Sequence, residues 1–147
     1  MTADEILSLP AGRELDALIA ERLFGWRWHN CEYIGQSSVA SPVYRTMFAE
    51  PKELEKNTSW RCVAMDNPHS GVRKKQEWTP HYSTSIADAW QVVEHIWNVL
   101  EKDISVTFAA GSISCDIGDL LGEAVAEVFA DTAPLAICRA ALLAMTP

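Results

Sequence analysis

The segment EWTPHYSTSIADAWQVVEHIW, residues 77–97, gives the strongest indication of secondary structure in the chain. From residue 86 onward, apolar side chains recur at three- and four-residue steps, which predicts an amphipathic helix over about 86–101. Ser85, with Asp88 three residues later, supplies the start of this helix. The apolar stripe, which we expect to lie in the core, consists of Ile86, Ala89, Trp90, Val93, Ile96, Trp97 and Leu100.

Directly before this helix stand four side chains with polar groups: His81, Tyr82, Ser83 and Thr84. Backbone amides and hydroxyl groups at a helix start can bind an anion. The alternative to an anion site is an ordinary helix cap. A cap explains the presence of Ser85 or Thr84 but explains His81 and Tyr82 less well. We expect His81 and Tyr82 to serve packing and a polar rim. His81, Tyr82 and Ser83 are therefore candidate ligand contacts without a catalytic role.

Helices are also predicted near both ends of the chain. Thr2 and Glu5 form a capping box for a short first turn. A second helix spans about 11–24 and ends at Gly25, and TAPLAICRAALLAM at 132–145 is a third, with Thr132 as cap and Pro134 in its first turn. The stripe of the helix at 11–24 consists of Leu15, Leu18, Ile19, Arg22 and Leu23.

Strands are predicted between these helices. Residues 26–50 suggest a hairpin broken at GQSS, 35–38, with Pro42 restricting its second strand to an edge. SWRCVAM at 59–65 and ISVTFAAG at 104–111 indicate two more strands, with a loop over 66–76. DLLGEAVAEVFAD at 119–131 is compatible with a helix or a buried strand, and periodicity slightly favours the helix. The order of elements indicates one layered α/β or α+β domain.

Composition excludes several classes of protein. The 147 residues suffice for one domain with a real core, and the net charge of −8 argues against binding a nucleic-acid polymer. No apolar run reaches the roughly 18 residues of a membrane span, and the acidic start MTADEILSLP lacks the features of a signal peptide. We therefore expect a cytoplasmic protein without membrane contact. Its four cysteines follow no disulfide or zinc spacing, so we expect all four to be reduced and buried.

Familiar catalytic and cofactor motifs are missing. GSISCDIGD at 111–119 lacks the lysine of a phosphate-binding loop, and we interpret it as a turn. His29 and Cys31 could begin a metal site, but no second pair stands at ligand spacing. We expect no metal, no cofactor and no enzyme activity.

Arg139 and the tryptophans are the remaining candidates for a binding site. Arg139 stands among apolar residues, so its guanidinium must contact a carboxylate, a carbonyl or a ligand phosphate. A structural contact and a ligand contact both remain open. Trp26 is one of six tryptophans, whose rings either stack on a nucleobase or fill cores and subunit contacts.

Three stretches together resemble the phage ABA sandwich domain family. They are LPAGRELDALIAERLFGW at 9–26, PHYSTSIADAWQVVEHI at 80–96 and DTAPLAICRAALLA at 131–144, and segment 30–75 shows no such likeness. The resemblance implies a small phage or prophage protein, with one α+β domain over 1–147 built as an α/β/α sandwich around a mainly antiparallel sheet. It also implies a strand at 124–130.

The family is in turn similar to phage sponge proteins that counter the Thoeris defence. That likeness implies a homo-oligomer that binds a cyclic ADP-ribose-type or cyclic oligonucleotide signal without cleaving it, through an arginine and an aromatic residue. The matching positions are Arg139 and Phe108. Trp26 is an alternative stacking residue, with His81, Tyr82 and Ser83 as polar contacts. The alternative function is a phage structural or protein-interaction module, with Arg139 in a salt bridge. An enzyme acting on the same nucleotides has only the histidines in its favour.

Overall fold

The computed structural model describes residues 1–35, 43–66, 68 and 74–147. The predicted turn at 35–38, Pro42 and most of the predicted loop at 66–76 lie outside these residues. The described helices are α1 (Ala3–Ser8), α2 (Arg13–Arg22), α3 (Pro51–Glu55), α4 (Ile86–Asn98) and α5 (Ala133–Ala144), with a 3-10 turn at Lys75–Glu77. Among the described helices, none has both the length and the apolar character needed to cross a bilayer.

The predicted caps of three helices are confirmed, whereas the helix predicted over about 11–24 is shorter, at Arg13–Arg22. Thr2 and Glu5 form the capping box of α1, and the hydroxyl of Ser85 accepts the Asp88 amide at the start of α4. Thr132 accepts the Leu135 amide in α5 in the same way. Because each cap is a contact between residues three apart, local sequence is enough to predict it.

Six strands form two antiparallel sheets. Sheet A has the order β2 (Tyr44–Ala49), β1 (Arg27–Tyr33), β3 (Trp60–Met65), and sheet B the order β4 (Asp103–Ala109), β5 (Ser112–Gly118), β6 (Ala124–Ala130). The strand at 124–130 confirms the family expectation, and the slight preference for a helix there was wrong. The prediction of a turn at 111–119 was also wrong, because Ser112–Gly118 pairs with both β4 and β6.

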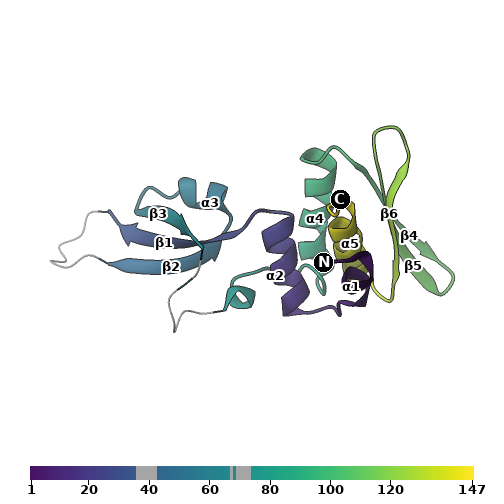
Figure 1. Cartoon of the computed structure of the whole chain (residues 1–147), viewed down its shortest axis with the longest axis horizontal. Helices are drawn as coiled ribbons and strands as arrows, with labels where there is room; N and C mark the ends of the chain where they lie inside the picture. Colours follow the sequence, from purple (N-terminus) through teal and green to yellow (C-terminus); the bar gives the residue numbers. More distant parts are fainter. Residues whose placement is uncertain (36–42, 67, 69–73) are drawn as a thin grey trace.

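The α+β class and the antiparallel pairing in one small domain are confirmed. The strands are divided between two sheets, and Figure 1 shows the sheets at opposite ends of the molecule with α1, α2, α4 and α5 between them. The short α3 lies against sheet A. The helices therefore form the middle layer of the chain.

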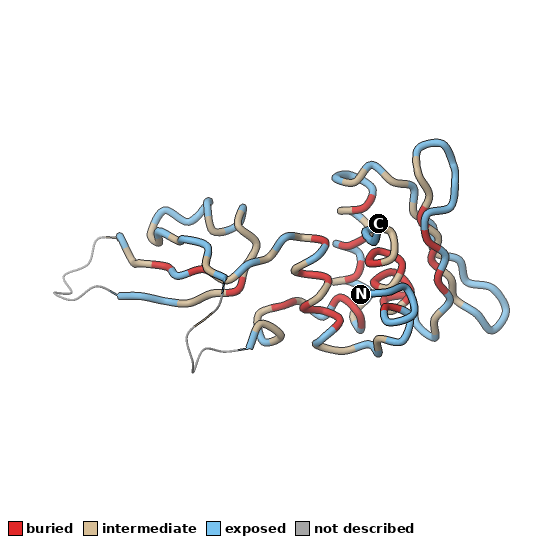
Figure 2. The backbone as a smooth tube through the Cα atoms, viewed as in Figure 1, coloured by how far each residue is buried: buried red, intermediate tan, exposed pale blue. Residues whose placement is uncertain are grey.

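The core lies where α5 covers one face of sheet B and packs against α4. Cys115 and Ile117 of β5 and Val128 of β6 are buried beneath α5, and Figure 2 shows burial concentrated in the helices and on this face of the sheet. Trp26 and Trp28 extend this core toward sheet A by packing on the buried ring of Phe48.

Two of the tryptophans expected in the core are exposed. Trp90 is 55 % exposed and Trp97 60 %, whereas Ala89, Val92 and Ile96 are fully buried. The apolar sector of α4 is wider than the surface it packs on, so the smaller side chains fill the core and the indole rings lie beyond its edge.

Cys31 and Cys62 form a disulfide, which corrects the prediction of four reduced cysteines. The two residues are 31 positions apart in sequence but directly opposite each other in the β1–β3 pairing. Their proximity depends on a strand register that sequence spacing does not reveal. Cys115 and Cys138 are free and buried, as predicted.

Candidate functional site

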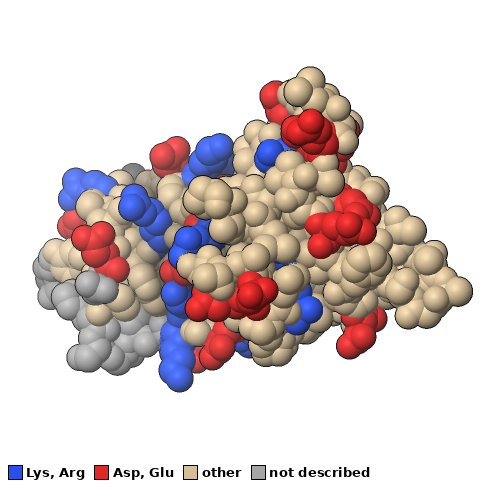
Figure 3. Space-filling model, turned by 45° about the vertical axis from the view of Figure 1, so that its right-hand side comes forward, with Lys and Arg blue, Asp and Glu red and all other residues tan. Residues whose placement is uncertain are grey.

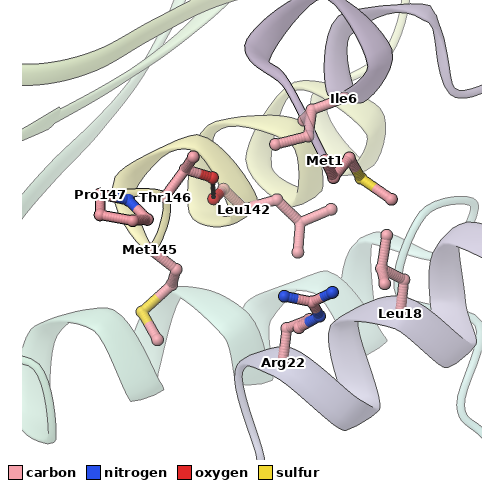
Figure 4. A pocket seen from close by; sticks show the side chains of 8 residues that line it. All are labelled: Met1, Ile6, Leu18, Arg22, Leu142, Met145, Thr146 and Pro147. Carbon is pink, nitrogen blue, oxygen red and sulfur yellow. Dashed lines mark hydrogen bonds between the residues drawn. The ribbon is translucent and has the colours of Figure 1, made fainter.

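A pocket lies between α1, α2 and the end of α5 (Figure 4). Its volume is about 510 Å³, and its walls expose polar and apolar surface in nearly equal share. The lining residues are Met1, Ile6, Leu18, Arg22, Leu142, Met145, Thr146 and Pro147. The site thus combines residues from both ends of the chain.

Arg22 is the one charged side chain among these lining residues, and Figure 4 shows its guanidinium directed into the space between α2 and α5. It stands in the last turn of α2, where the helix dipole favours a cation. Within the described part of the chain, no carboxylate forms an ion pair with it. Its hydrogen-bond donors are therefore available to an anion in the pocket.

Arg139 does not line this pocket, but it holds one of its walls. Its Nε and Nη2 atoms donate to the carbonyl oxygen of Leu9, at 3.0 and 2.6 Å. Leu9 is the C-cap residue of α1, and Ile6 of the same helix lines the pocket. Of the three predicted kinds of partner, the structure shows a carbonyl, and this contact ties α1 to α5.

Ser83 belongs to a second polar cluster, at the start of α2. The carboxylate of Asp16 is fully buried and accepts hydrogen bonds from the Ser83 amide and hydroxyl, both at 2.7 Å. The Gly12 amide donates to the Ser83 hydroxyl at 2.9 Å. Ser83 therefore joins the segment before α4 to the start of α2, a structural role that satisfies buried polar groups.

Arg13 completes this cluster. Its Nη1 atom lies 2.8 Å from a carboxylate oxygen of Asp16, and it also donates to the carbonyl of Pro80 at 3.1 Å. Further donors contact the carbonyls of Gln76 and Thr79. Sequence reasoning missed Arg13, Asp16 and Thr79. The sequence did offer a signal for this cluster. Asp16 stands beside Leu15 on the apolar side of a predicted helix, and Arg13 three residues earlier could pair with it.

A family model described as the phage ABA sandwich domain matches residues 17–142. The chain belongs to this family. Comparisons with curated proteins and with solved structures gave no match. The ABA sandwich match includes segment 30–75, which had shown no resemblance by inspection. Within the pocket, Leu18, Arg22 and Leu142 lie inside the matched range, and α1 lies before it.

The other residues that were predicted to contact a ligand do not line this pocket. Tyr82 is buried and stacks on Phe24 with ring centroids 5.3 Å apart, and its burial raises the pKa of its phenol. His81 is exposed, and its backbone amide donates to Asp88. Tyr82 therefore has the expected packing role, whereas His81 lies at the surface away from the pocket.

The two aromatic candidates belong to opposite ends of the ABA sandwich. Trp26 packs against Phe48 next to sheet A, and Phe108 is 71 % exposed near the end of β4 in sheet B. Tyr82 and Ser83 are adjacent in the segment before α4, and Arg139 lies near the pocket. It does not bring the six predicted residues into a single site.

The cysteine and histidine pair does not form a metal site. Cys31 is engaged in the disulfide, and the Nδ1 atom of His29 lies 2.9 Å from the carbonyl of Arg27. In the residues with described positions, no three His, Cys, Asp or Glu side chains are grouped to hold a metal ion.

Proposed function

We propose that this phage ABA sandwich protein binds a small nucleotide-derived anion in the pocket between α1, α2 and α5. The observation that carries the proposal is the guanidinium of Arg22, directed into a pocket whose other lining side chains are mostly of apolar residues. Ligand pockets of this kind occupy roughly 300–1,000 Å³ and have few polar groups, which fix the orientation of the ligand.

The chemistry of the walls selects the class of ligand. A guanidinium can donate two parallel hydrogen bonds to a phosphate. Leu18, Leu142 and Met145 offer apolar and polarisable surface to the faces of a base or a ribose. A phosphate joined to a flat heterocycle satisfies both parts of the pocket at once.

The biological role that we propose is sequestration of a nucleotide immune signal. The ligand class is that of cyclic ADP-ribose-type molecules or cyclic oligonucleotides, held intact in the cytoplasm of the infected host. The support for this role is the resemblance to Thoeris sponges that we expect from the sequence, together with the anion-binding chemistry of Arg22. By binding the signal without cleaving it, the protein lowers the free concentration that reaches the host defence.

The test is calorimetric titration and thermal shift with cyclic ADP-ribose isomers, cyclic di- and trinucleotides, ADP-ribose and NAD. A ligand at a hundred times its Kd stabilises the folded state by about 2.7 kcal/mol. Arg22→Ala removes a charged hydrogen-bond donor, so the affinity falls by about ten- to a hundredfold. Arg27→Ala, which removes an exposed arginine of sheet A, is the matched control and leaves the affinity unchanged.

Three results contradict the proposal. They are no binding across the panel, equal binding by Arg22→Ala and wild type, or recovery of a cleaved ligand. The last result points to an enzyme.

A second function, as a phage structural or protein-interaction module, is favoured by the exposed tryptophans of α4. Affinity purification from infected cells, with Trp90→Glu beside wild type, tests it. A phage protein that co-purifies only with wild type supports the module. Recovery of the same proteins with both variants contradicts it.

A further inference from the structure

Another pocket lies between sheet A and α3, beside the disulfide that joins β1 to β3. Its volume is about 220 Å³, a size suited to a small molecule. Sheet A contributes His29, Trp60 and Cys62 to its walls, and α3 contributes Leu54. One half of the disulfide therefore borders a cavity, next to a histidine.

The two cysteines of the disulfide differ in access. Cys31 is fully buried, whereas Cys62 is partly exposed and lines the pocket. A disulfide is opened by a thiol that attacks one of its sulfur atoms, and access decides which sulfur is attacked. A thiol in the pocket therefore reacts at Cys62, and the sulfur of Cys31 is the leaving group.

This buried leaving group requires a proton. If the sulfur of Cys31 left as a thiolate, it would carry an unpaired charge away from water, which is costly. His29 stands two residues before Cys31 on β1, so both side chains lie on the same face of the strand, about 7 Å apart. His29 is only 4 % exposed and lines the pocket. An imidazole is therefore present on the face of the strand where the proton is needed.

The hydrogen bonding of His29 leaves one ring nitrogen open to this role. Nδ1 lies 2.9 Å from the carbonyl oxygen of Arg27, which can only accept, so Nδ1 carries the proton of the neutral ring. Burial lowers the pKa of His29, against a smaller opposing effect of this hydrogen bond, so the ring is neutral at neutral pH. In the described part of the chain, no group forms a hydrogen bond with Nε2. Nε2 can therefore take up a proton and release it again.

We propose that Cys62 is a site of reversible thiolation by a low-molecular-weight thiol, which enters the pocket between sheet A and α3 and exchanges with the Cys31–Cys62 disulfide. The thiol gives its proton to Nε2 of His29, and its sulfur forms a bond to Sγ of Cys62. The bond between the two Sγ atoms breaks, and its electron pair goes to Sγ of Cys31, which takes the proton from Nε2. The products are a mixed disulfide at Cys62 and a thiol at Cys31. The step consumes no oxidant and leaves no net charge in the pocket.

The exchange site and the nucleotide pocket are separate. The pocket with Arg22 lies among α1, α2 and α5, whereas the exchange site lies in sheet A and α3 at one end of the molecule (Figure 1). Thiolation therefore does not depend on the proposed ligand, and either proposal can fail alone. The exchange opens the covalent link between β1 and β3 and leaves their antiparallel pairing in place.

The first test locates the adduct in the wild-type chain. Oxidised protein is treated briefly with 2-mercaptoethanol at neutral pH, quenched with acid, alkylated and analysed by peptide mass spectrometry. In the native protein the mixed disulfide is expected on Cys62 and the alkyl group on Cys31. The urea-unfolded chain, in which both sulfur atoms are accessible, is expected to give adducts on both cysteines. An adduct on Cys31 of the native protein, or no adduct where the unfolded chain reacts, overturns the proposal.

The second test examines the proton transfer. His29→Gln keeps a polar side chain that cannot carry the proton, so the rate of exchange is expected to fall about a hundredfold. His95→Gln alters another partly buried histidine, which packs on Phe24 outside the pocket, and leaves the rate unchanged. A variant that only loosened sheet A would expose the disulfide and react faster. An equal or faster rate in His29→Gln therefore overturns the role of His29.

The third test examines the route of entry. Leu54→Trp narrows the pocket from the side of α3 and retains both His29 and the disulfide, so exchange is expected to slow about tenfold or more. Lys52→Trp, on an exposed part of the same helix, is the matched control and keeps the wild-type rate. Circular dichroism verifies that the variants remain folded. Equal rates in Leu54→Trp and Lys52→Trp would show that the thiol reaches the disulfide by another route, and would overturn the proposal.

Discussion

At the scale of single residues, the polar groups inside this protein serve connections between segments. Asp16 is fully buried, and it joins α2 to the segment before α4 through Ser83 and Arg13. Arg139 likewise joins α5 to the end of α1 through the carbonyl of Leu9. Sequence alone identified Arg139 as unusual, because a charge among apolar neighbours requires a partner. It could not identify the partner, since Leu9 lies 130 residues away.

We predict that Asp16→Ala strongly lowers the free energy of unfolding. The change leaves the partly exposed Arg13 without its carboxylate and removes both hydrogen bonds that Ser83 donates to Asp16, at a cost of about 2–4 kcal/mol. Urea unfolding followed by circular dichroism measures the loss. Glu14→Ala, on the exposed side of the same helix, is the control and changes stability little. A loss below about 1 kcal/mol for Asp16→Ala would show that the cluster contributes little.

At the scale of elements, predictions that depend on neighbouring residues hold, and those that depend on distant partners fail. The helix caps at Thr2, Ser85 and Thr132 are local and were predicted from the sequence. Strand β5 was missed, although Ile113, Cys115 and Ile117 alternate with polar residues at the period of a strand. Its flanking glycines favoured a turn, and the strands that pair with it lie outside any local window.

The pocket could not be predicted from the sequence either, because its walls come from residues that are distant along the chain. Arg22 was assigned only to the stripe of the helix at 11–24, and nothing near it in sequence indicates a pocket. The opposite wall comes from Leu142 and Met145, which α5 brings across the helical layer. Which face of each helix turns inward depends on tertiary packing, and periodicity alone does not decide it.

The disulfide of sheet A supplies a prediction at the element scale. Under oxidising conditions Cys62→Ser removes the link between β1 and β3, and the chain-entropy model for this separation gives a loss of about 3–4 kcal/mol. Thermal unfolding measures the change. Dithiothreitol is expected to lower the melting temperature of wild type toward that of the variant and to leave the variant unchanged. Four titratable thiols in denatured, unreduced wild type would show that the bond does not form.

At the scale of the whole molecule, charge is distributed unevenly along the long axis. Residues 27–75 contain eight of the twelve Lys and Arg residues but five of the twenty Asp and Glu residues, so this segment has a net charge of +3 and the rest −11. Figure 3 shows Lys and Arg mixed with carboxylates over sheet A and its junction with the helices, whereas carboxylates predominate toward the end with sheet B. Within residues 27–66, which include sheet A, five Lys and Arg residues balance five Asp and Glu residues, so the positive excess comes from Arg73, Lys74 and Lys75.

Stability of the whole molecule is expected to fall as the pH decreases from 7.5 to 5.5. Burial lowers the pKa of His29 and of His95 below the ordinary value, against smaller opposing effects of the Arg27 carbonyl and of Glu50. The unfolded chain therefore binds protons in this range more readily than the folded chain, and the free energy of unfolding decreases as protons are taken up. Melting temperatures at the two pH values measure the effect. His95→Gln is expected to reduce the difference between them, whereas the same change at the exposed His81 leaves it intact. Equal melting temperatures at both pH values would mean that neither His29 nor His95 resists protonation in the folded chain.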